Sequence, residues 1–164
     1  MSSERPPALF APAELAPWAT PSRVRRRAAL EPRRAEERRV MERLRDVASD
    51  LAGRFGLRYR AIDPERDGVN AHYGICYDDG SIRIRLRHAR TRRLLKESSL
   101  VDTLCHELAH LRHLDHSLRF RRLYARILDE ARRAGYYRPG PEAAARPRQL
   151  SLFRIADCGT RSRL

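Results

Sequence analysis

A chain of 164 residues fits one domain with flanking segments. Its 35 lysines and arginines exceed its 21 acidic residues and give a formal net charge of +14, which favours a polyanionic partner such as DNA. Three scattered cysteines exclude a disulfide framework, and no apolar run approaches the roughly 20 residues of a membrane span, so we expect a cytoplasmic protein without a membrane partner.

The first 30 residues combine prolines with alanines and arginines, a composition typical of a disordered basic arm. From about Pro32 to Ala52 the pattern changes, because apolar residues recur every three or four positions and charged residues lie between them. The apolar positions are Val40, Leu44, Val47 and Leu51. We therefore predict a long amphipathic helix, which Gly53 and Gly56 bring to an end.

Three short strands are predicted after this helix. The first runs from Leu57 to Ile62 and is followed by a turn at 63–68, while segments 73–77 and 81–87 form a hairpin around a turn at 78–80. In the last strand, isoleucines and a leucine alternate with Arg83, Arg85 and Arg87. One face of this strand should pack in the core, and the basic face is either solvated or lies against phosphate groups.

A further helix is predicted from residue 98 or 99 through Leu111, and it carries the sequence His-Glu-x-x-His at 106–110. Two histidines four residues apart on a helix point to the same side, where they can hold one Zn²⁺. Glu107, between them, is then placed to serve as general base for a zinc-bound water. This pattern indicates a zinc-dependent hydrolase, with His106 and His110 as metal ligands.

A catalytic zinc requires a third protein ligand, and two more histidines follow the motif. If the helix continued, His113 would lie about 10 Å along its axis from His106, too far for both to bind one ion. The chain must therefore bend after His110. His116 lies far enough beyond this bend to return to the metal, and we favour it over His113, with a distant carboxylate as the other alternative.

A second helix should follow from about Leu118 to Ala134, with Ser117 or Asp115 as its cap and Gly135 as its stop. These elements predict an α+β fold. A small antiparallel sheet of about three strands would pack on the long N-terminal helix, the His-Glu-x-x-His helix and the helix after it.

The sequence at 106–110, followed by His116, Ser117 and Phe120, resembles the YgjP-like metallopeptidases. It is also similar to the SprT-like and WLM-type zinc proteases, and the latter share a histidine at the His113 position. The resemblance covers about residues 40–137, with the detailed match at 105–120. It implies a small sheet beside the zinc helix pair, with zinc held by His106, His110 and His116, Glu107 as the base, and Phe120 as a packing residue.

The match departs from both patterns in detail. Ser117 stands where the SprT-like pattern usually has glycine, and Arg121 stands where the YgjP-like pattern often has tryptophan. The partner of the oxyanion is also left open among Tyr136, Tyr137, His113 and an arginine. Cys105 is interpreted as a buried apolar residue, and His72 and His88 as non-catalytic.

The C-terminal region begins with a proline-rich linker at 138–148, which is followed by Gln149-Leu150-Ser151-Leu152-Phe153. This pentapeptide resembles, at all five positions, the peptides with which bacterial replication and repair proteins bind the sliding clamp. The glutamine would supply hydrogen bonds, and Leu152 and Phe153 would enter an apolar pocket of the partner. The alternative is a last strand that packs on the domain.

We therefore expect a disordered arm at 1–30, a zincin-like metallopeptidase domain at 31–137, and a flexible tail at 138–164 with a docking peptide at 149–153. The SprT-like and WLM-type proteases are associated with cleaving proteins crosslinked to DNA. The resulting hypothesis is a zinc metalloprotease that is recruited through the sliding clamp and acts on DNA-bound proteins. The alternatives are a general cytosolic YgjP-like peptidase and a non-enzymatic, zinc-containing adaptor between clamp and DNA.

Overall fold

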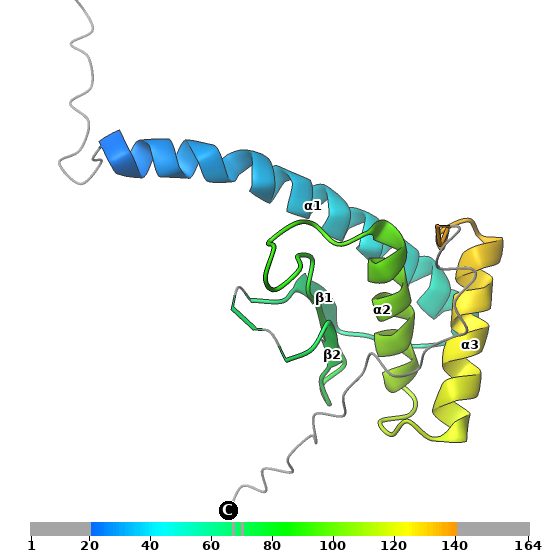
Figure 1. Cartoon of the computed structure of the whole chain (residues 1–164). Helices are drawn as coiled ribbons and strands as arrows, with labels where there is room; N and C mark the ends of the chain where they lie inside the picture. Colours follow the sequence, from blue (N-terminus) through cyan, green and yellow to red (C-terminus); the bar gives the residue numbers. More distant parts are fainter. Residues whose placement is uncertain (1–20, 67, 70, 141–164) are drawn as a thin grey trace, which may run out of the picture. The chain divides into compact units, whose positions relative to one another are not determined.

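The computed structural model describes residues 21–66, 68–69 and 71–140, with side chains from residue 30 onward. The chain divides into two compact units, residues 1–36 and 37–164, and the hydrophobic core belongs to the second. In chain order the elements are α1 (Pro21–Phe55), β1 (Ala61–Pro64), β2 (Gly74–Cys76), β3 (Ser81–Ile84), α2 (Glu97–His110) and α3 (Leu118–Arg133) (Figure 1). The predicted α+β class is confirmed. None of the described helices is long and apolar enough to cross a membrane.

Helix α1 begins earlier than the sequence predicts. Its first residue is Pro21, and Pro32, which we expected near the start of the helix, lies inside it. The described part of the first unit is therefore helical, and residues 1–20 of the expected arm lie outside the described residues. A proline suits the first turn of a helix because it has no N–H to leave unpaired, which is why Pro32 indicated a start. The helix runs to Phe55, so Gly53 lies inside it, while Gly56, with a φ of 59°, ends it as predicted.

The core of the second unit is formed by one face of each helix and one face of the sheet. On α1 the predicted apolar face is buried, and α2 and α3 contribute the side chains that meet it. From the sheet, Ile62, Ile82 and Ile84 are at most 2% exposed, as the alternation in β3 predicts. The core therefore fixes α2 against both the sheet and α3, the two neighbours that it contacts in Figure 1.

The sheet has three strands in the order β1-β3-β2 and is mixed. The predicted hairpin is present, because β2 pairs antiparallel with β3 and Gly80 closes the turn with a φ of 79°. Strand β1 instead pairs parallel with β3, with Ile62 opposite Ile82, which corrects the expectation of a wholly antiparallel sheet. The segment between β1 and β2 carries the chain to the far side of β3, so β2 forms an edge of the described sheet, beside α2.

Candidate metal centre and active site

Three histidines converge at the end of α2. The Nε2 atom of His106 lies 3.1 Å from Nε2 of His110 and 3.1 Å from Nε2 of His116. Candidate ligand atoms of all three lie within 4.8 Å of one another, and no other such group occurs in the part of the chain that the structure describes. Two imidazole nitrogens on one tetrahedral Zn²⁺, each at about 2.0–2.1 Å, are about 3.3 Å apart. The donor set therefore fits a single metal ion.

The bend that brings His116 back begins where α2 ends, at His110. The backbone amides of Arg112 and His113 both donate to Ala109 O, at 3.2 and 3.1 Å, which forms a tight turn. Helix α3 then starts with Ser117 as its cap, whose side chain accepts from the Phe120 amide at 3.5 Å. The helix end and the cap together place His116 against the two motif histidines.

His113 contributes its backbone to the site. His110 Nδ1 lies 3.0 Å from the carbonyl oxygen of His113, which can accept only if Nδ1 carries a proton. This contact favours the tautomer in which Nε2 of His110 is the free, metal-binding nitrogen. The structure therefore brings together His106, His110 and His116 and leaves the His113 side chain out of the group.

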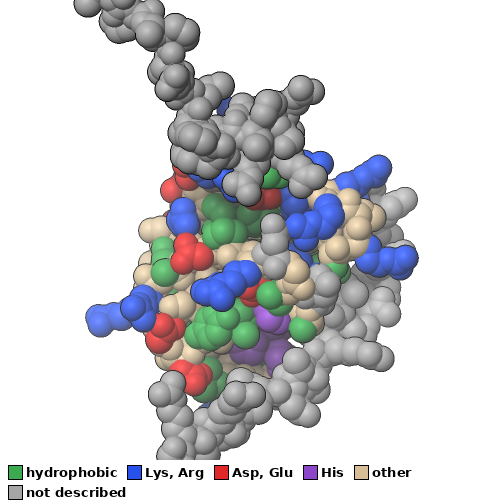
Figure 2. Space-filling view, turned by 90° about the vertical axis from the view of Figure 1, so that its left-hand side faces the viewer, with side chains coloured by type: hydrophobic (Ala, Val, Ile, Leu, Met, Phe, Trp, Pro, Cys, Tyr) green, Lys and Arg blue, Asp and Glu red, His purple; other side chains and the backbone are tan. Residues whose placement is uncertain are grey.

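Phe120 of α3 packs against all three imidazole rings. Its ring centroid lies 4.9, 4.4 and 4.8 Å from those of His106, His110 and His116. Phe120 is 2% exposed, so one side of the cluster is closed by an apolar side chain. His110 is partly exposed and His116 is exposed, so another side of the cluster is open to solvent. Figure 2 shows histidine side chains at the surface beside hydrophobic ones.

Burial sets the protonation state of the histidines. Burial, together with the neighbouring His110 and His116, lowers the pKa of His106 to about 3. Burial also lowers the pKa of His110. Both imidazoles are therefore neutral at physiological pH, and the neutral form is the one that binds a metal.

Glu107 is 3% exposed and lies against the edge strand β2. Burial raises its pKa to about 8, and a hydrogen bond from the backbone N–H of Cys76 acts in the opposite direction. A Cβ atom on Gly74 would lie only 2.6 Å from Oε1 of Glu107 and 2.7 Å from Cγ2 of Thr103. The carboxyl group thus occupies space that only a glycine leaves open, and its pKa suits proton transfer near neutral pH.

Sequence reasoning missed two residues behind the histidines. The Tyr124 hydroxyl donates to the Asp102 carboxylate, and the Tyr124 ring centroid lies 5.6 Å from that of His106. Asp102 is four residues before His106 on α2, and Tyr124 is four residues after Phe120 on α3. Helical spacing from the motif was the signal that could have found both.

The remaining sequence-predicted residues lie away from the cluster or outside the described residues. The Tyr136 hydroxyl donates to Asp50 on α1 at 3.1 Å, and Tyr137 lies under Arg132 with 5.0 Å from its ring centroid to the guanidinium carbon. Cys105 is fully buried, as expected. His72 contacts Glu65, and His88 accepts backbone hydrogen bonds in its own loop. The pentapeptide 149–153 lies outside the described residues.

Residues 62–150 match the WLM domain family, and no curated protein matches the chain. Among solved structures, Wss1 from Saccharomyces cerevisiae aligns with a TM-score of 0.58 and 16% identity, over 63% of this chain and 85% of that one. Wss1 from S. pombe aligns with a TM-score of 0.52 and 25% identity, over 60% of this chain and 82% of that one. A mutant of the S. pombe protein aligns with a TM-score of 0.52 and 24% identity, over 60% of this chain and 87% of that one. Because the family match spans more than half of the sequence, the chain belongs to the WLM domain family.

Proposed function

We propose that this protein is a zinc metalloprotease that cleaves proteins bound or crosslinked to DNA. The observation that carries the proposal is the convergence of three imidazole Nε2 atoms next to a buried glutamate on the same helix. Membership of the WLM domain family supports it, because the WLM-type proteases that the motif resembles are associated with such substrates. Zn²⁺ is the proposed metal because three neutral histidines with an open position are typical of catalytic zinc.

In the proposed mechanism His106, His110 and His116 hold the metal through Nε2. When bound, Zn²⁺ supplies a Lewis acid that lowers the pKa of a coordinated water towards about 7 and polarises the peptide carbonyl. Glu107 accepts the proton of the attacking water at its carboxylate and delivers it to the leaving amine. The Cys76 amide orients that carboxylate, and Phe120 keeps water from the rear of the imidazoles.

The decisive experiment measures bound metal and cleavage separately. Elemental analysis should find one zinc per chain in the wild type, a loss of zinc in His116→Ala, and full zinc in the matched variant His113→Ala. Glu107→Gln should keep the zinc and lose cleavage of a DNA-bound protein, by at least a factor of about 10². Full cleavage by zinc-loaded Glu107→Gln would contradict the protease function and leave a zinc-containing adaptor.

We further propose that the tail recruits the enzyme to its substrates. The match of residues 149–153 to sliding-clamp-binding peptides supports this, and so does the net charge of +14. Tethering raises the local concentration of enzyme and substrate without requiring affinity between them. The arginines would add a salt-dependent affinity for DNA. An enzyme bound to DNA in this way would act in the cytoplasm, at the nucleoid.

Clamp recruitment is tested with a peptide that covers residues 146–156. It should bind purified bacterial sliding clamp, and the same peptide with Leu152→Ala and Phe153→Ala should not. If the unaltered peptide failed to bind, the chain would be a general metallopeptidase whose tail has another role.

A further inference from the structure

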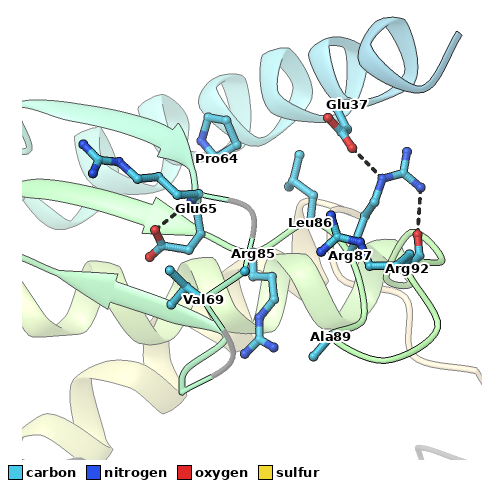
Figure 3. A pocket seen from close by; sticks show the side chains of 11 residues that line it. Glu37, Pro64, Glu65, Val69, Arg85, Leu86, Arg87, Ala89 and Arg92 are labelled. Carbon is cyan, nitrogen blue, oxygen red and sulfur yellow. Dashed lines mark hydrogen bonds and ion pairs between the residues drawn. The ribbon is translucent and has the colours of Figure 1, made fainter. Parts of the chain in front are cut away.

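A cavity of about 40 Å³ lies between Glu37 of α1, the end of β1 with the residues after it, and the segment that follows β3 (Figure 3). It shares no lining residue with the histidine cluster. One ordered water requires roughly 10–15 Å³, so a cavity of this size accepts a compact group of a few heavy atoms but no nucleobase. The charged residues of its lining are Glu37, Glu65, Arg66, Arg85, Arg87 and Arg92.

Both glutamates of the lining already have partners. Glu37 accepts from Nε of Arg87 at 2.5 Å, the contact drawn at the top of Figure 3. Glu65 accepts from the amide of Arg66 at 2.8 Å, and its other oxygen lies 2.9 Å from Nε2 of His72. The described residues of the lining thus include four arginines and two glutamates, and Arg85 is the buried one among the arginines. A buried guanidinium in a partly enclosed space favours an anion.

Arg85 is the buried member of this lining, with an exposed fraction of 8%. Its Nη2 donates to the carbonyl oxygen of His72, and its guanidinium carbon lies 4.4 Å from the centre of the Tyr73 ring. These contacts fix the guanidinium in place. Nε of Arg85 is nevertheless buried without a hydrogen-bond partner. Arg85 lines the cavity, and in Figure 3 its side chain extends between Val69 and Ala89.

A buried N–H donor without an acceptor costs free energy, and native structures satisfy nearly all such groups. Within the described part of the chain, Arg85 forms no ion pair with a carboxylate, and its contacts are a carbonyl oxygen and an aromatic ring. A water could accept from Nε of Arg85, but it would leave the charge of this buried guanidinium without a counterion. A tetrahedral oxyanion satisfies both the N–H donor and the charge, because it offers several acceptor oxygens and a negative charge in a volume of this size.

We propose that this cavity is an oxyanion site that binds one phosphate group, with the buried guanidinium of Arg85 as its donor and its source of charge and with Arg92, an exposed lining residue, as a second contact. The site does not depend on the proposed protease activity. That the phosphate belongs to a DNA backbone does rest on the proposed DNA-bound function, and a free phosphate ion is the other source of the same chemistry.

The test observes the arginine Nε–H signals of the full-length protein in ¹H–¹⁵N spectra. Inorganic phosphate, and separately a short single-stranded DNA oligonucleotide, are titrated at an ionic strength held constant with sodium chloride. The Arg85 signal, identified by its absence in Arg85→Lys and by resonance assignment, should shift saturably. Arg92→Ala, an exposed lining residue, should weaken binding about tenfold, as expected for a charge-assisted contact. Arg90→Ala, exposed and outside the lining, removes the same charge and should leave binding unchanged.

Saturable shifts with both ligands, weakened by Arg92→Ala alone, would support a site for a nucleic-acid phosphate. A response to inorganic phosphate without a response to the oligonucleotide would support the oxyanion site and exclude DNA as its source. An Arg85 signal that responds to neither ligand, or equally to chloride, would overturn the proposal and leave a water-filled cavity. Because no outcome involves peptide cleavage, failure of the protease function would be seen separately.

Discussion

At Gly74 the backbone of the edge strand passes close to the proposed general base. Added at this position, a Cβ atom would meet Oε1 and Cγ of Glu107 at 2.6 and 2.8 Å. Both atoms belong to a side chain that is 3% exposed, so the carboxyl group has little room to move aside without losing the Cys76 amide. The function of Gly74 in this site is therefore to leave space, which gives a direct test.

Gly74→Ala should lower kcat for peptide cleavage by about a hundredfold while the zinc content stays at one per chain, since a displacement of about 1 Å at a catalytic group has that effect. Gly53→Ala is the matched control, because no other atom lies within 4 Å of its Cβ position. In a Glu107→Gln background the Gly74→Ala substitution should cost no further activity. An unchanged kcat in Gly74→Ala would show that this contact does not hold the base.

Glu65 gives a prediction for the pH dependence of stability. Burial alone would raise its pKa, but hydrogen bonds from His72 and the Arg66 amide, with the charges of His72 and Arg83, bring it below the ordinary value of 4.5. A carboxyl whose pKa is lower in the folded than in the unfolded chain stabilises the fold above the unfolded pKa. That stabilisation is lost as the pH falls through the folded pKa.

The difference in unfolding free energy between wild type and Glu65→Gln should accordingly shrink as the pH falls below about 4.5. Urea unfolding in the presence of a chelator measures it without a contribution from bound metal. Glu42→Gln, at an exposed position of α1, controls for the loss of one negative charge. A difference that stayed constant down to pH 3 would refute the role given to the Glu65 contacts.

At the level of the elements, α3 packs the ring of Phe120 against all three imidazoles of the metal site. Phe120→Ala should lower the unfolding free energy by about 3–5 kcal/mol, because it removes a large side chain that is 2% exposed. The same change should weaken zinc binding, since the three imidazoles lose their common packing partner. Leu118→Ala, two residues earlier and 61% exposed, should change stability by less than about 0.5 kcal/mol. Equal zinc affinities in Phe120→Ala and wild type would show that the histidines are positioned without this ring.

The helices and the histidine cluster could be predicted because their signals are local. Residue spacing within one helix identifies His106 and His110, and the requirement for a bend after α2 identifies His116. The parallel pairing of β1 could not be predicted, because a strand of four residues carries no information about which neighbour it meets beyond a loop. The contact of Gly74 with Glu107 joins segments far apart in the sequence, and a glycine at a strand end indicates no particular partner.

For the molecule as a whole, the strongest prediction is that the metal site carries out cleavage and the tail affects only recruitment. The three histidines and Phe120, the ring that packs against all of them, lie within residues 106–120. Substitutions in the pentapeptide 149–153 should therefore leave cleavage of a free protein substrate unchanged. They should affect only the cleavage that depends on recruitment, since tethering changes local concentration and not the chemistry at the metal.

The experiment compares the full-length wild type with a Leu152→Ala/Phe153→Ala variant on a protein crosslinked to DNA, with and without the sliding clamp loaded on that DNA. Clamp should accelerate cleavage by the wild type at least tenfold, within the range that tethering provides, and should not accelerate the variant. Ile155→Ala, an apolar truncation just beyond the pentapeptide, should behave as the wild type. If the clamp accelerated the variant as well, recruitment would have to come from the basic surface, and the acceleration would then fall steeply as salt is added.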